Sequence, residues 1–136
     1  MMHELRPRPC ASCPYRCDVA PGVWSADEYA KLTEYDGDTA YQSPTWFGCH
    51  SDDGQTVCAG WLGHRDPADL LGVRIGVSAG WLPPAACTYQ TDVDLFATGA
   101  EAAAHGLSAI DEPGDETVST VAKIVAARAA RERRAQ

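Results

Sequence analysis

Four of the six cysteines stand where their thiols can share one metal ion. Cys10 and Cys13 form a C-x-x-C motif, which lets two thiolates face the same metal because the backbone between them bends and turns its N–H groups towards the sulfurs. Cys49 and Cys58 follow farther along the chain, separated by eight residues that include a polar turn. The sequence therefore predicts a four-cysteine metal site with the spacing C-x2-C-x35-C-x8-C.

Four thiolates suit two kinds of metal group. Tetrahedral zinc and the [4Fe-4S] cluster both take cysteine ligands, and the spacing alone does not separate them. Zinc is the commoner structural metal, so we expect zinc, with a [4Fe-4S] cluster as the alternative.

The remaining thiols and one imidazole leave the ligand set open. Cys17 lies just after the C-x-x-C motif and can replace one ligand or act as a resolving thiol. His50 can bind the metal in place of Cys49 or Cys58, although we favour a turn residue that hydrogen-bonds locally. Cys87 is predicted to be a core residue, and the plainest alternative for the second pair is that they too are small buried hydrophobic residues.

The chain lacks the marks of secretion or membrane insertion. Its first residues contain no charged segment followed by an apolar one, as a signal peptide requires. No apolar run approaches the roughly 18 residues of a transmembrane helix. We therefore expect a cytoplasmic protein, in which clustered cysteines are metal ligands or redox groups before they are disulfides.

Helix signals occur in three places before the C-terminal region. Ser25 with Glu28 forms a capping box at the start of a helix that Gly37 ends. An N-cap followed by proline predicts a helix over residues 67–79. A second capping box predicts another helix within residues 98–106.

Strands are expected to be few and short. Residues 38–64 are rich in turns, and the second pair of cysteines on either side of the polar turn 51–54 fits a hairpin or knuckle. Apolar and acidic residues alternate at residues 92–95, which predicts a short strand. A strand over residues 73–77 is an alternative to helix there.

A chain of 136 residues has the size of one domain. Nine Pro, twelve Gly and only two Phe indicate short elements with many turns, and such a fold benefits from a metal staple. We therefore predict an α+β fold that is mostly helical. Its globular domain would span residues 1–112, stapled by the four-cysteine site, and a C-terminal amphipathic helix with a basic end would span residues 113–136.

The net charge of −8 is unevenly distributed. Five basic residues against one acidic residue give residues 123–134 a charge of +4, which leaves −12 on the rest of the chain. An acidic body repels a phosphate backbone, so direct binding of nucleic acid is not expected and the partner is predicted to be another protein. The apolar stripe of Val118, Val121 and Val125 either docks on such a partner or, as we favour, packs on its own domain.

The sequence contains no strong motif of a known enzyme class. Residue types alone allow a nucleophile pair of Cys49 or Cys87 with His64 or His105, but no nucleophile elbow surrounds either cysteine. Neither the P-loop pattern nor the dinucleotide pattern G-x-G-x-x-G occurs. Binding is therefore favoured over catalysis.

Three motifs together resemble an uncharacterised family of short proteins from actinobacteria and their phages. They are the C-x-x-C-P-aromatic-Arg start at residues 10–16, the Cys49-His50 pair, and the C-A-G-W block at residues 58–61. The resemblance runs from about residue 10 to residue 106. It implies that the four cysteines belong together, but it names no activity.

Two families that hold iron–sulfur clusters share part of this pattern. The WhiB-like transcription factors use four cysteines, but their closely spaced last three are not matched in order here. The cluster-bearing uracil-DNA glycosylases open with a similar C-x-x-C-P run, but their catalytic motifs are missing. In the resembling family the position of Cys17 is usually not cysteine, which implies that Cys17 lies outside the site.

Together these features predict a metal-binding protein that acts through macromolecular interaction, with a regulatory role by analogy alone. The alternative is a redox-active iron–sulfur or thiol protein, in which Cys17 and the metal site respond to oxidants or pass electrons.

Overall fold

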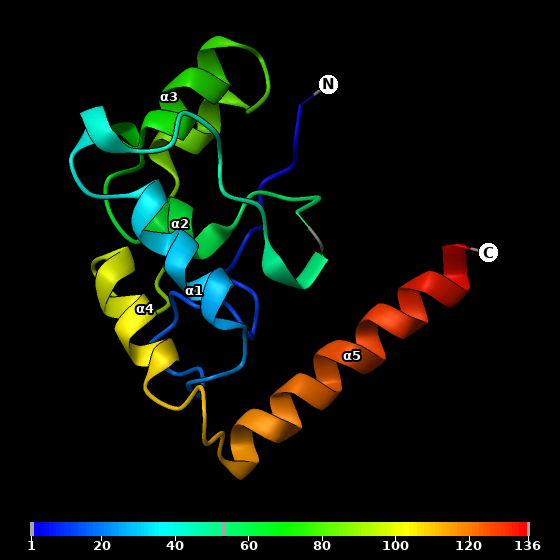
Figure 1. The fold of residues 1–136 in the computed structure, drawn as a ribbon. Helices are drawn as coiled ribbons and strands as arrows, with labels where there is room; N and C mark the ends of the chain where they lie inside the picture. The colour runs from blue at the N-terminus through cyan, green and yellow to red at the C-terminus, as the bar shows by residue number, and fades with distance from the viewer. Residues whose placement is uncertain (1, 53, 136) are drawn as a thin grey trace.

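Short helices joined by long loops make up the fold of the computed structural model, which describes residues 2–52 and 54–135 (Figure 1). The α-helices within these residues are α1 (Ala26–Lys31), α2 (Ala59–Gly63), α3 (Leu71–Ser78), α4 (Gly99–Leu107) and α5 (Asp115–Ala135). Short 3-10 helices occupy Leu32–Tyr35, Thr39–Tyr41, His50–Asp52, Pro67–Asp69 and Pro84–Thr88.

The predicted α+β class is wrong. About half of the chain is helical, and the described residues form no strand or sheet, only isolated bridges. Residues 92–95 carry a single bridge, between Leu95 and Arg16, instead of a strand. A single bridged pair of residues does not make a ladder of hydrogen bonds between two strands, so loops take the place of the expected strands.

The hairpin predicted around the polar turn 51–54, between Cys49 and Cys58, is wrong as well. Gly48 and Val57 form one antiparallel bridge, but the chain between them turns through a 3-10 helix. The carboxylate of Asp52 accepts the backbone N–H of Gln55 at 3.0 Å. This local hydrogen bond competes with a ladder, as Asp side chains in turns commonly do. Position 53 of the predicted turn lies outside the described residues.

The predicted N-cap Ser25 is confirmed at the start of α1. The hydroxyl of Ser25 accepts the backbone N–H of Glu28 at 3.4 Å. The α-helix ends at Lys31, continues as the 3-10 helix, and the chain then turns at Gly37, whose φ of +92° suits glycine.

The helix predicted over residues 67–79 is divided in two. Asp66 caps the 3-10 helix Pro67–Asp69, Leu70 is extended and fully buried, and α3 begins after it. The side chain of Gln42 accepts the backbone N–H of Leu71 at 2.8 Å. This cap comes from a distant segment, so local pattern could not place the break. The alternative of a strand over residues 73–77 is wrong.

The predicted N-cap Thr98 is confirmed at the start of α4, where its hydroxyl accepts the backbone N–H of Glu101 at 3.1 Å. Helix α4 lies against α1 and the 3-10 helix that follows it (Figure 1). Gly106 allows this close approach, because a Cβ there would overlap with the ring of Tyr29.

Helix α2 lies in the middle of the core, and its first four residues, Ala59 to Leu62, are all buried. The largest side chains in the protein that are almost completely buried include Trp61 and Leu62 of α2 itself. The others are Tyr15, Leu32, Leu70 and Leu82. The body is therefore held by apolar packing across segments that are far apart in sequence.

Helix α5 starts near the lower end of α4 and runs diagonally past the body as one long helix (Figure 1). Its only buried residue in the described range is Thr117, whose hydroxyl donates to the Pro21 carbonyl at 2.7 Å. No helix among the described residues is both long and apolar enough to cross a membrane.

Candidate functional site

The four cysteines predicted as ligands lie in the interior, brought there by two turns. In the first turn the Cys13 N–H donates to the Cys10 carbonyl at 3.0 Å. In the second, the N–H of Cys49 donates to the carbonyl of Thr56 at 2.8 Å, and Cys58 follows. The exposed fractions of the four are 8%, 0%, 1% and 2% in chain order. The structure thus gathers two pairs of thiols from distant parts of the chain.

The four thiols lie near one another in a row. Cys49 interacts with Cys10, Cys10 with Cys13, and the Sγ of Cys13 lies 3.9 Å from the Sγ of Cys58. No three His, Cys, Asp or Glu side chains within residues 2–52 and 54–135 form a group arranged to hold a metal ion. The predicted staple, a finished metal site around which the domain folds, is therefore wrong. These side chains satisfy one another as neighbouring thiols, and apolar packing holds the body.

Hydrogen-bond donors and a positive charge surround this row of thiols. The backbone N–H of Trp61 donates to the Sγ of Cys58 at 3.4 Å. The Oγ of Ser51 lies 3.2 Å from the Sγ of Cys49, and Arg6 donates to the same sulfur through Nη1 at 3.6 Å. Such donors stabilise a thiolate and are typical of the surroundings of metal-bound cysteines.

Neighbouring thiols and burial raise the pKa values of Cys10, Cys13 and Cys49. Contact with Cys13 raises the pKa of Cys10, and contact with Cys10, followed by burial, raises the pKa of Cys49. Contact with Cys10 lowers the pKa of Cys13, but contact with Cys58 and burial outweigh it and raise that pKa well above its usual value. A protonated thiol is a poor nucleophile, so the row does not favour cysteine catalysis.

Gly60 and Tyr15 form a wall behind Cys13. A Cβ at position 60 would overlap with the sulfur of Cys13 and lie 2.9 Å from the Cβ of Tyr15. Tyr15 is fully buried, and its hydroxyl has no hydrogen-bond partner among the described residues. Burial raises the pKa of Tyr15 well above its usual value. Water is therefore excluded on this side of the row.

Two cysteines lie outside the row. Cys17 is exposed, as expected for a thiol outside the site, and its backbone N–H donates to the Asp94 carbonyl at 3.1 Å. Cys87 is half-buried in the 3-10 helix Pro84–Thr88 and packs against the core. Its position agrees with the prediction of a core residue.

His50 pairs with a carboxylate instead of a thiol. Its side chain is 7% exposed, and its Nε2 lies 2.8 Å from the Oε2 of Glu28. The ring lies near Trp24 and Phe47, with centroid distances of 4.9 and 5.2 Å. The favoured prediction of a residue hydrogen-bonded within its own turn is therefore wrong. His50 and Cys49 instead line a pocket of about 570 Å³ between α1, α5 and the second turn.

Sequence reasoning missed a buried polar pair below the row. The Nε2 of His64 lies 3.2 Å from the Oδ2 of Asp36, and its Nδ1 contacts the Trp61 carbonyl. The same Asp36 carboxylate accepts the backbone N–H of Gly99 at the start of α4. An acidic residue just before Gly37 was the only signal available, and it reads equally well as a turn residue.

The nucleophile pairs considered from sequence do not form through hydrogen bonds in the described part of the chain. His64 is held by Asp36 and Trp61, and the Nε2 of His105 lies 2.7 Å from the Val19 carbonyl. Both imidazoles therefore hold parts of the fold together.

The chain resembles a described protein family along most of its length. No curated protein and no solved structure matches it. The model of DUF6283, a family of unknown function, matches residues 5–128, a span that contains the whole row of thiols and ends within α5. The chain therefore belongs to DUF6283, a family of unknown function.

Proposed function

We propose that the row of thiols binds a zinc ion, and that the protein is a metal-binding protein that acts through contact with another protein. One observation carries this proposal: four buried thiols from two distant segments lie near one another, with 3.9 Å between the sulfurs of Cys13 and Cys58. Buried cysteines that serve only as small hydrophobic residues have no need to meet in fours.

The spacing of the sulfurs favours zinc over a cluster. In a tetrahedral site with Zn–S bonds of about 2.3 Å, the sulfurs lie about 3.8 Å apart. The distance of 3.9 Å between Cys13 and Cys58 suits such an edge. In a [4Fe-4S] cluster each cysteine binds a different iron, so the sulfurs lie farther apart.

The charges near the row also support metal binding. Four thiolates with one zinc ion carry a net charge of −2, which is costly to bury without compensation. Arg6 donates to Cys49, and Arg16 interacts electrostatically with Cys13 and Cys10. Because all four ligands come from the protein, the site would leave no position for a substrate.

The proposal also covers the compartment, the kind of partner and the source of the protein. Six free cysteines suit a reducing compartment, so we place the protein in the cytoplasm. The acidic body favours a protein partner over nucleic acid. A bacterial or phage origin rests on the motif resemblance alone.

The test is to purify the protein without oxygen and measure its metal content and absorbance spectrum. We expect a colourless protein with one zinc per chain, and loss of that zinc in Cys10→Ser and Cys58→Ser. Cys17→Ser is the matched control and should keep the metal. A brown protein containing iron and sulfide would show that the site holds an iron–sulfur cluster instead of zinc. A folded protein that binds neither metal would refute the proposal.

A redox function is the second candidate, favoured by the same contact between Cys13 and Cys58. An added disulfide oxidant would accept two electrons and two protons as the two sulfurs join, and the oxidant would leave as its thiol form. Mass spectrometry of the oxidised protein should then find a Cys13–Cys58 disulfide that forms reversibly. Retention of zinc and free thiols under mild oxidation would exclude this function.

A further inference from the structure

Helix α5 is longer than its contact with the body requires. It has 21 residues, yet Thr117 is the one residue of the helix that is buried in the described structure. A second attachment lies farther along, where the Nη2 of Arg128 donates to the His50 carbonyl at 2.8 Å and its guanidinium lies 5.9 Å from the centre of the Trp24 ring. Between and beyond these two points the helix is largely open to solvent.

The apolar surface of α5 is wider than the part that faces the body. At about 100° per residue, Val121 and Ile124 share a side with the two attachment points, Thr117 and Arg128, and this side lines the pocket beside His50. A second stripe lies about 100° around the helix from that side. It contains Val118, Ala122, Val125 and Ala129. Val118 and Val125 are 58% and 61% exposed, so the body leaves most of this second stripe uncovered, although Val125 also lines the edge of that pocket.

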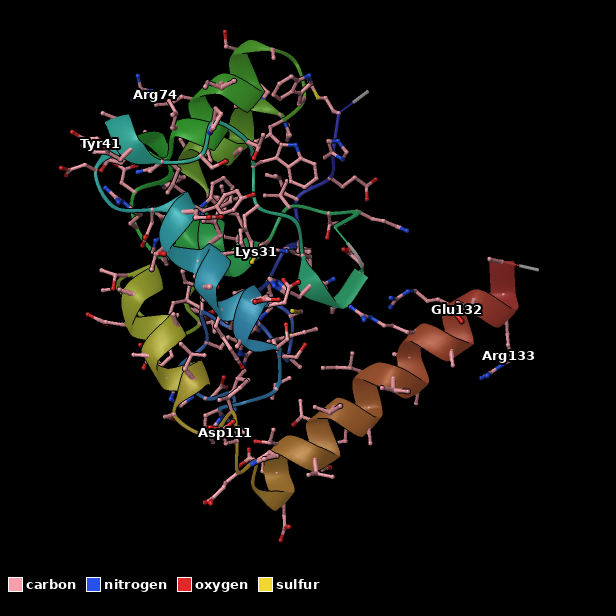
Figure 2. All side chains as sticks on the ribbon, in the orientation of Figure 1. Lys31, Tyr41, Arg74, Asp111, Glu132 and Arg133 are labelled. Atoms are coloured by element: carbon pink, nitrogen blue, oxygen red, sulfur yellow. The ribbon has the colours of Figure 1, made fainter. Side chains whose placement is uncertain are left out.

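The two ends of α5 carry opposite charges. Asp115 and Glu116 open the helix, preceded by Asp111 and Glu112, whereas Arg133 and Arg134 lie in its last turn. Figure 2 shows Asp111 beside the start of α5, with Glu132 and Arg133 at the opposite end. An antiparallel pair of such helices places each acidic start against a basic end, whereas a parallel pair places like charges together.

We propose that α5 pairs in antiparallel orientation with α5 of a second copy of this chain. Val118, Ala122, Val125 and Ala129 form the contact, and their small side chains let the two helix axes approach closely. The opposite charges at the ends set the orientation. One helix from each chain buries an area at the low end for specific complexes, so the dimer dissociates in about the micromolar range. This inference goes beyond metal binding and does not depend on it.

Sedimentation velocity of the full chain over a range of concentrations tests the pairing. We expect a monomer–dimer equilibrium that Val118→Asp weakens at least tenfold. The matched control is Ser119→Asp, which adds the same charge at the next, exposed position on a different side of the helix, and it should dimerise like the parent. Circular dichroism of each variant checks that α5 is still helical.

Charge exchange tests the orientation. One double variant, Asp115→Arg with Glu116→Arg, and another, Arg133→Glu with Arg134→Glu, should each dimerise more weakly than the parent. In an antiparallel pair each variant alone places like charges together at both ends, whereas in a parallel pair the parent's like charges already meet, and neither variant would weaken association further. A mixture of the two should recover association as a heterodimer, because the first variant is basic at both ends of the helix and the second is acidic at both. Arg74→Glu, an exposed charge reversal on α3, should leave the equilibrium unchanged.

Three results would overturn the proposal. A chain that stays monomeric to high concentration would show that α5 does not pair with a second copy, and that any partner of this face is a protein of different sequence. A dimer that survives Val118→Asp would use another surface. Double charge variants that each dimerise as tightly as the parent would exclude the antiparallel orientation.

Discussion

Gly60 packs so closely against Cys13 that a methyl group at position 60 would overlap with the Cys13 sulfur. This contact joins α2 to the N-terminal loop and fixes the position of one thiol in the row. Glycine costs a helix about 1 kcal/mol relative to alanine. Its presence inside α2 is therefore explained by the space that the sulfur needs.

Gly60→Ala should destabilise the protein by about 1–3 kcal/mol, because the clash outweighs the gain in helix propensity. Urea unfolding followed by circular dichroism gives the free energy, and zinc content measured on the same samples should fall. Gly63→Ala in the same helix is the comparison, since the nearest atoms to a Cβ there, at 3.0 and 3.1 Å, are at the ends of the Thr91 and Tyr89 side chains. Equal behaviour of the two variants would contradict the role given to Gly60.

Cys17 should be the first thiol to react with a maleimide reagent in the native protein, because it is exposed and the four thiols of the row are buried. Residual burial, with the nearby charge of Asp94, raises the pKa of Cys17. The thiolate is the reactive form, so the labelling rate should keep rising as the pH passes 9, the ordinary value for cysteine here.

Peptide mapping after brief labelling identifies the modified residue. Urea should open all six cysteines to the reagent and serves as the positive control. Rapid native labelling at Cys10 or Cys58 would show that the row is not enclosed.

Arg6→Gln should lower the affinity for zinc by about tenfold or more, because it removes a positive donor from the Cys49 thiolate. The same guanidinium lies 3.6 Å from the carboxylate of Asp52, so the second turn should also become looser. Competition with a coloured chelator measures the affinity. Arg74→Gln removes an exposed charge on α3 and should have no effect. If the zinc affinity of Arg6→Gln is unchanged, Arg6 does not contribute to metal binding.

Asp36→Ala should destabilise the fold by about 3–5 kcal/mol, because it leaves His64 and the backbone N–H of Gly99 without their buried acceptor. Asp36→Asn keeps an oxygen acceptor and should lose less. Chemical unfolding compares both with Asp38→Ala, an exposed neighbour that should be near neutral. If Asp36→Ala is as stable as Asp38→Ala, the buried pair does not hold α4 in place.

Local patterns predicted the helices better than they predicted their limits. The capping boxes at Ser25 and Thr98 mark the starts of α1 and α4 because the side chain and its backbone partner are close in sequence. The break at Leu70 depends on Gln42, which lies in a distant loop. The expected strands failed because alternation of apolar residues requires a neighbouring strand to pair with, and the loops supply only single bridges.

The candidate site shows the same division. Residue type and spacing were enough to group Cys10, Cys13, Cys49 and Cys58, which the structure places in contact. The roles of His50 and His64 could not be derived, since each depends on a carboxylate from another segment, Glu28 or Asp36. Chain topology, which brings these carboxylates to the imidazoles, is not visible in local sequence.

The loop that carries Cys10 and Cys13 has consequences for how the chain folds. Residues 2–24 contain no helix, and contacts with distant segments hold them, such as those of Cys13 with Cys58 and of Arg16 with Leu95. Closing such long loops costs chain entropy before any contact can repay it, whereas α1 and α4 begin with local caps. We therefore expect the N-terminal loop to dock late in folding and to open first in hydrogen exchange, so that half of the thiol row assembles only after the helices have formed.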